Sequence, residues 1–361
     1  MPSLKHATRR LLTTCGLLGL AASPAYATGP SVQTDTLQTL IRSAVGVADD
    51  RIDQEDDRTS LYRRSGGNGS GSILGSSRDG RFLLSDPSQP NSLYVSVTGL
   101  QGYRDSTDGQ RGLEFHDFTT SVGMERRFGD HWLVGGSLGY GGGLDNSAGR
   151  VLTADRTSHL ASVYGAYDRG RWYIDGDAFW GWDRYDAIHR TNLNGSITNA
   201  KANGTEWGGS LTGGMMFNAG PTRLGPILGM HLSGAQIDGF TEGGNASTLA
   251  RWTDQRDMAI SSQFGGEVQY TNLPSGWLAP RLRLAWDHRI NQFHRDLTLS
   301  MVNAPATSVS VPGTRENDDR LRARLGFGGV IAPGLSGGMD YEALVGGGLD
   351  QRLTAQLHYA F

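Results

Sequence analysis

The residues of this sequence that could perform chemistry are mostly scattered. Nine histidines are spread over 361 residues, and none has the His-Glu-x-x-His or Cys/His spacing that holds zinc. Asp175 and Asp177 would place two carboxylates on one face of a strand, which suits either a calcium ion or a wall facing water. No phosphate-binding glycine loop of the P-loop type occurs. We therefore predict no enzyme activity, no cofactor and no metal site, and favour the water-facing wall for the two aspartates.

The charged residues instead follow the two-residue period of β-strands. In residues 281–286 and 320–327, arginines alternate with leucine, alanine or aromatic side chains, and residues 352–361 alternate in the same way. One face of each strand is thus apolar, while the other carries charge that a dry core would not accept unpaired. We predict that these side chains line a watery lumen, in which the arginines neutralise the aspartates: Asp175, Asp177, Arg281, Arg283, Arg320, Arg322, Arg324 and Arg352.

Twelve segments show this alternation. They are 92–104, 114–128, 131–145, 155–169, 171–185, 204–219, 222–237, 255–271, 277–291, 318–332, 334–347 and 349–361. The gaps between them alternate between short and long, which is typical of transmembrane β-barrels. Together with 53 glycines and no long apolar run, the pattern predicts an all-β fold, a 12-stranded antiparallel transmembrane β-barrel with both termini at the short-turn end. A soluble sandwich or propeller is the competing fold.

The N-terminus has the pattern of a secretory signal peptide. Three basic residues precede an apolar run at 11–22, and Ala25 and Ala27 supply the small-x-small cleavage site. The run is too short to span a bilayer. We predict that residues 1–27 are removed after export through the Sec translocon. The mature chain then contains no cysteine, because Cys15 is the only one.

Between the signal peptide and the barrel (91–361), we expect a helical segment (28–64) and a Gly/Ser-rich linker (65–90). Apolar residues recur at helical spacing in the first of these. Acidic residues crowd its second half, among them Asp49, Asp50, Asp53, Asp56 and Asp57. An acidic helix matches an arginine-rich lumen electrostatically, and a helix about 10 Å across would fit a twelve-stranded barrel. We expect it to plug the pore. The alternative is a solvated helix outside the barrel.

The chain ends on Leu357-His358-Tyr359-Ala360-Phe361, which resembles the C-terminal signal of bacterial outer-membrane barrels. The resemblance implies that the barrel-assembly machinery recognises Leu357, Tyr359 and Phe361. With twelve strands and an upstream helix, the chain resembles the translocator domain of an autotransporter (type V secretion). Residues 225–226 and the stretches 237–242, 254–257, 278–281 and 286–288 are similar to the lipase/esterase-type branch of that family.

The chain departs from that branch in one respect. Enzymes of the branch have an N-terminal hydrolase domain with a Gly-Asp-Ser-Leu motif, which is absent here. We therefore expect an outer-membrane translocator that passes an N-terminal segment through its pore, without an evident large passenger. The alternative is a small porin-like channel gated by the helix, in which case residues 292–317 are the candidate for an inward-folded loop. A surface adhesin would depend on the loops 186–203, 238–254 and 292–317. Expected partners are outer-membrane lipid and the export machinery, not nucleic acid, and the expected state is a monomer.

Overall fold

The structure, a computed structural model, describes residues 40–49, 51–52, 90–106, 112–129, 131–192, 194–246, 248–270, 280–294, 296–311, 319–332 and 334–361. The predicted signal peptide with Ala25 and Ala27, the linker, and most of the acidic cluster (Asp50, Asp53, Asp56 and Asp57) lie outside these residues. The described part of the N-terminal region is a helix, over residues 40–49 and 51–52.

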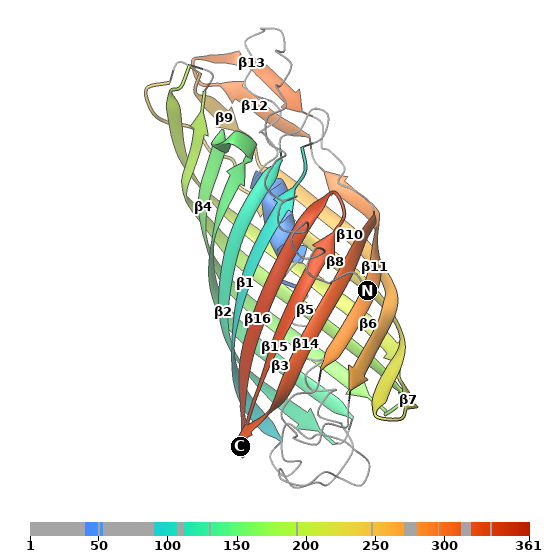
Figure 1. The fold of residues 1–361 in the computed structure, drawn as a ribbon. Helices are drawn as coiled ribbons and strands as arrows, with labels where there is room; N and C mark the ends of the chain where they lie inside the picture. Colours follow the sequence, from blue (N-terminus) through green and yellow to red (C-terminus); the bar gives the residue numbers. More distant parts are fainter. Residues whose placement is uncertain are drawn as a thin grey trace, which may run out of the picture. The chain divides into compact units, whose positions relative to one another are not determined.

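The rest of the described chain is almost entirely antiparallel strand (Figure 1). Twelve strands form one closed sheet: β1 (Asn91–Arg104), β2 (Leu113–Phe128), β3 (Trp132–Ser147), β4 (Leu152–Asp168), β5 (Trp172–Thr191), β6 (Ile197–Met215), β8 (Thr222–Ile237), β10 (Gln255–Tyr270), β11 (Arg281–His294), β14 (Asp319–Ala332), β15 (Leu335–Val345) and β16 (Gly348–Ala360). Strand β1 pairs with β16, and β8 pairs with β10, so that the sheet closes. The short β7 (Phe217–Ala219) extends the hairpin with β8. The predicted 12-stranded antiparallel barrel is confirmed.

Three expected loops are partly strand, which corrects the sequence prediction. Strands β5 and β6 continue through most of 186–203, where polar residues on both faces had indicated a loop. Residues 238–254 and 292–317 contribute β9 (Ala250–Trp252), β12 (Leu297–Met301) and β13 (Ala304–Val311), which form a separate three-stranded sheet. Figure 1 shows this sheet beyond one end of the barrel. The described part of 292–317 thus pairs with another loop, and is not the inward fold expected of a porin constriction.

The two ends of the barrel differ in their connections. At the end carrying Asn91 and Ala360, hereafter the turn end, strands are joined mainly by short turns such as 169–171, where Gly170 takes the left-handed conformation at φ 79°. The opposite end, hereafter the loop end, carries β9, β12 and β13. This asymmetry agrees with the alternating gap lengths of the sequence, and places both ends of the barrel sequence at the turn end, as predicted.

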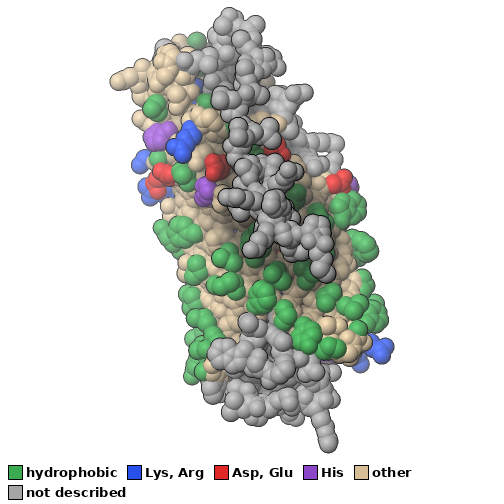
Figure 2. Space-filling model, viewed as in Figure 1, with side chains coloured by type: hydrophobic (Ala, Val, Ile, Leu, Met, Phe, Trp, Pro, Cys, Tyr) green, Lys and Arg blue, Asp and Glu red, His purple; other side chains and the backbone are tan. Residues whose placement is uncertain are grey.

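Side chains alternate between the inside and the outside of the barrel. Along β1, Tyr94, Ser96 and Thr98 are buried, whereas Val95 and Val97 are about half exposed. Several large aromatic side chains face outward, since Trp172, Trp180, Trp182, Trp286 and Tyr359 are all exposed. Figure 2 shows apolar side chains spread over the visible wall, with the histidine and most of the charged side chains toward the loop end and a few basic side chains at the turn end. No helix in the described residues is long and apolar enough to cross a membrane.

Candidate pore and its helix

The helix lies inside the barrel. Every described residue of it is buried, including Leu40, Val47 and Ile52 with no exposed surface. Val47 packs near the loop end, in a cluster with Leu113 and Phe115 of β2. Ile52 packs deeper, against Phe179 of β5. The segment from 40 to 52 is about 20 Å long at 1.5 Å per residue, so the helix runs from the loop end toward the middle of the lumen.

Three strands hold the helix through charged side chains. Asp49 forms an ion pair with Arg320 of β14 at 2.7 Å. Arg51 lies 2.5 Å from a carboxylate oxygen of Glu206 on β6 and 3.7 Å from one of Asp117 on β2. In the closed strand order, β14, β2 and β6 are each four strands apart. The helix is therefore fixed from three directions spaced evenly around the barrel.

Glycines on the lumen face make room for the helix. A Cβ added to Gly208 of β6 would lie 2.9 Å from the side chain of Ile52, and one on Gly141 of β3 would lie 3.6 Å from the Arg51 guanidinium. Four of the inward positions of β3 are glycine, namely 135, 139, 141 and 143. The wall beside the helix thus lacks side chains at these positions, which leaves space for the helix and explains part of the high glycine content.

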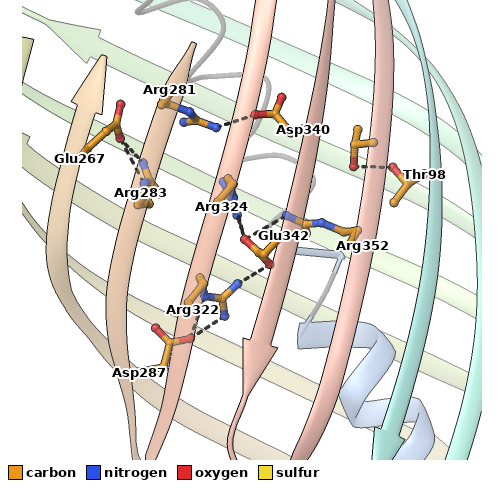
Figure 3. Close-up of polar contacts among 11 residues, drawn as sticks. Thr98, Glu267, Arg281, Arg283, Asp287, Arg322, Arg324, Asp340, Glu342 and Arg352 are labelled. Carbon is orange, nitrogen blue, oxygen red and sulfur yellow. Dashed lines mark hydrogen bonds and ion pairs between the residues drawn. The ribbon is translucent and has the colours of Figure 1, made fainter. Parts of the chain in front are cut away.

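The predicted arginines form a network on the wall built by β11, β14, β15 and β16 (Figure 3). The carboxylate of Glu342 lies 2.9 Å from Arg322, 2.6 Å from Arg324 and 3.4 Å from Arg352. Arg322 also pairs with Asp287 at 2.7 Å. Two further pairs join Arg281 to Asp340 at 3.0 Å and Arg283 to Glu267 at 3.0 Å. Buried guanidinium groups require such partners, because an isolated buried charge is very costly.

The wall on the β2–β6 side carries more carboxylates than cations. Asp117, Asp145, Asp183 and Glu206 are all buried there, around Arg156. Arg156 lies 2.7 Å from Asp117 and 3.9 Å from Glu206. Ser43 of the helix donates a hydrogen bond to Asp145. The lumen thus has an arginine-rich side and a carboxylate-rich side, and Asp49 and Arg51 of the helix face them respectively.

The other predicted site residues lie apart from this network. Asp175 and Asp177 are on β5. Ser210 of the neighbouring strand β6 donates a hydrogen bond to Asp177. The arginines pair with carboxylates of adjacent strands and of the helix, and the neutralisation of Asp175 and Asp177 by arginine stays a prediction. Leu357, Tyr359 and Phe361 face outward at the end of the chain, each about half exposed.

Sequence reasoning missed the carboxylates that complete the network. Asp287, Asp340 and Glu342 occupy inward positions that the alternation of β11 and β15 could have identified. Sequence reasoning also missed Arg51, because its contacts on β2 and β6 are with residues 66 and 155 positions further along the chain. Pairing between such distant segments leaves no local signal.

Two serines of the described residues have the sequence spacing of a hydrolase nucleophile but not its structural setting. Two Gly-x-Ser-x-Gly strings occur, centred on Ser137 and Ser336, but both serines lie within strands, β3 and β15, not on the strand-to-helix turn that exposes a nucleophile. Ser137 is hydrogen-bonded to Ser162 at 2.6 Å. In the described ranges, no three His, Cys, Asp or Glu side chains are grouped as a metal site.

Comparison with known proteins agrees with the barrel and its helix. The family model described as "Autotransporter beta-domain" matches residues 93–342. The chain is similar in structure to the translocator domain of the autotransporter NalP from Neisseria meningitidis, with a TM-score of 0.66 and 16% identity over 90% of this chain and 99% of that one. The β domain of the Bordetella autotransporter BrkA gives a TM-score of 0.57, also at 16% identity, over 75% of this chain and 100% of that one.

Two curated relatives are named for hydrolytic activities. The chain is 24% identical to Esterase EstA of Pseudomonas aeruginosa over 238 residues, covering 64% of this chain and 36% of the relative. It is 25% identical to Lipase 1 of Photorhabdus luminescens over 224 residues, covering 60% and 34% respectively. The chain thus spans about a third of the length of the curated relatives it matches. The predicted resemblance to autotransporters, and to their esterase branch, is confirmed.

Proposed function

Because this chain belongs to the autotransporter β-domain family, and is therefore an outer-membrane barrel, we propose that it passes the segment before residue 91 through its lumen and then keeps the helix inside as a plug. The observation that carries the proposal is the complete burial of the helix, with ion pairs to β14, β2 and β6. In these contacts, charged side chains of the strands pair with opposite charges of the helix. The charges of the lumen therefore match those of this helix.

The proposal also sets the orientation and the partners. The turn end faces the periplasm, so that residue 40 lies near the cell surface and the chain returns to Asn91 on the periplasmic side. Residues 1–27 direct export through the Sec translocon and are then removed. The barrel-assembly machinery recognises the outward side chains of Leu357, Tyr359 and Phe361. The barrel acts as a monomer and makes or breaks no covalent bond in the process.

The first test is the conductance of single barrels in planar bilayers. The full mature chain is expected to be nearly silent, and a variant lacking residues 28–64 should show large steady openings. High conductance from both proteins would favour the porin-like channel and exclude the helix as a plug. Silence from both would indicate a lumen filled by its own side chains, and would exclude an open path for a passenger.

A charge swap tests whether the ion pair seats the helix. Asp49→Arg and Arg320→Asp each place like charges about 3 Å apart in a buried site, so each variant alone should conduct more than the unmodified barrel. Combining Asp49→Arg with Arg320→Asp restores an opposite-charge pair, and should restore silence. If the conductance of the double variant instead equals the sum of the increases of the two single variants, the Asp49–Arg320 pair does not position the helix.

A further inference from the structure

The outer wall has a depression where β14, β15, β16 and β1 lie side by side. Gly329 of β14 is directly opposite Gly337 of β15, and the same row continues through Leu357 and Val95. Both glycines are at outward positions. The two missing side chains leave a groove of about 440 Å³ on the membrane-facing surface, with apolar walls.

The walls of the groove are side chains that face the bilayer. Ile331, Met339 and Leu357 line it and are about half exposed. A Cβ on Gly337 would lie only 2.9 Å from Ile331 Cδ1 and 3.1 Å from Leu357 Cδ2. The tips of these two side chains therefore reach over the glycine, and any larger residue at 337 would occupy the floor. The groove depends on glycine at this position.

The size and composition of the groove favour an acyl chain over a protein. Stable protein interfaces use about 20–30 residues on each side, whereas twelve residues line this groove. Moving an acyl chain from the bilayer into the groove gains no hydrophobic free energy, because both surroundings are apolar. The gain is close packing, which is also what small residues provide between membrane segments.

A polar anchor lies at the turn end, on the same outer face as the groove. Asn91 of β1 is four residues from Val95, about 13 Å along the strand, and its partner on β2 is Arg126. Arg126 is exposed, with its guanidinium 5.4 Å from the centre of the Phe128 ring. On the same face, Tyr359 stacks with Phe361 at 6.5 Å. Exposed aromatic rings of this kind mark the headgroup level of a bilayer, where arginine binds phosphate well.

We propose that this groove binds one acyl chain of a membrane phospholipid, with the lipid phosphate held by Arg126. The site lies on the outer wall, and so does not depend on whether the helix plugs the lumen. An anionic phospholipid is expected to bind better than a zwitterionic one, because its headgroup carries no ammonium group that would repel Arg126.

The test is photo-crosslinking in liposomes made of phosphatidylcholine. The full mature chain is reconstituted with a trace of phosphatidylglycerol that carries a diazirine on one acyl chain, and the labelled peptides are identified by mass spectrometry. Labelling should be several-fold higher on the outward residues of β14, β15, β16 and β1 than on the equally exposed outward residues of β3 to β5. Arg126→Gln should reduce the yield to that obtained with diazirine-labelled phosphatidylcholine.

Substitutions of outward glycines inside and outside the groove provide matched variants for this test. Gly337→Leu should remove the enrichment, whereas Gly176→Leu should retain it, because Gly176 is an outward glycine of β5 whose Cβ would meet nothing closer than 3.4 Å. Gly329→Leu replaces Gly337→Leu if the latter fails to fold. Labelling in proportion to exposure around the barrel would overturn the proposal. So would a dimer that Gly337→Leu abolishes, since a second copy would then occupy the groove. Measuring the same crosslinking pattern in the variant lacking residues 28–64 separates lipid binding from the plug, because the enrichment should persist without the helix.

Discussion

At the scale of single residues, the lumen shows how a barrel tolerates many buried charges. Glu342 accepts contacts from three arginines on two neighbouring strands, β14 and β16. Arg283 and Arg324 are directly opposite each other across β11 and β14, so two like charges are adjacent in the same row. Glu267 and Glu342 lie on either side of this pair and compensate it. Glu342 therefore compensates three arginines, and Glu267 compensates Arg283.

Removing the Glu342 charge should destabilise the barrel. Glu342→Gln leaves three buried guanidinium groups without their shared carboxylate, and loss of one partner of a buried ion pair costs about 3–5 kcal/mol. The expected result is a lower denaturant midpoint in detergent micelles, followed by tryptophan fluorescence. Glu114→Gln is the control, because Glu114 is half exposed and pairs only with His116 among the described residues, and its midpoint should hardly change. Equal midpoints for the two variants would contradict this account of the network.

At the scale of elements, the sequence predicted what local alternation determines. The twelve barrel strands were predictable because outward positions must be apolar across the membrane, while inward positions are polar or small. The alternation of apolar and polar residues weakens where β5 and β6 extend beyond the membrane-spanning part of the barrel, because both faces of the strands are polar there. The pairing of β12 with β9 was not predictable, because it joins segments about fifty residues apart that carry no shared pattern. The helix was predictable from its period, but its partners on the walls were not.

The glycines of the lumen face give an element-scale prediction. Gly208→Leu places a large side chain where Ile52 and the ring of Phe179 already lie, and such overpacking typically costs about 1–3 kcal/mol. The helix should seat poorly, and single-channel conductance should rise. Gly213→Leu is the matched control on the same strand, because Gly213 faces outward with no neighbour closer than 3.4 Å. A barrel with Gly208→Leu that remains silent would show that the helix does not need this glycine.

At the scale of the whole barrel, the two ends differ in their connections and the two sides of the lumen differ in charge. Short turns gather at one end and the β9–β12–β13 sheet at the other. Across the lumen, arginines dominate the β11–β16 side and carboxylates the β2–β6 side. A helix with Asp49 and Arg51 only two residues apart presents opposite charges on opposite faces, since two residues rotate the helix by about 200°. One orientation of the helix therefore satisfies both sides.

The direction of the barrel in the membrane follows from this asymmetry and can be tested with single cysteines. The only cysteine of the sequence, Cys15, lies in the proposed signal peptide, so the mature protein offers a background without thiols. Asn194 is exposed in the connection between β5 and β6 at the loop end, and Asn218 is exposed in β7 at the turn end. With the turn end in the periplasm, a membrane-impermeant maleimide should label Asn194→Cys in intact cells.

The same reagent should reach Asn218→Cys only after the outer membrane is permeabilised, and the identical change at both sites makes their reactivities comparable. The reverse result would place residue 40 toward the periplasm, and a plug left behind by outward passage of the N-terminal segment would no longer follow. Labelling of both sites in intact cells would mean that the reagent crosses the barrel itself, which a seated helix should prevent. Deleting residues 28–64 provides the comparison, because opening the lumen should then expose Asn218→Cys without permeabilisation.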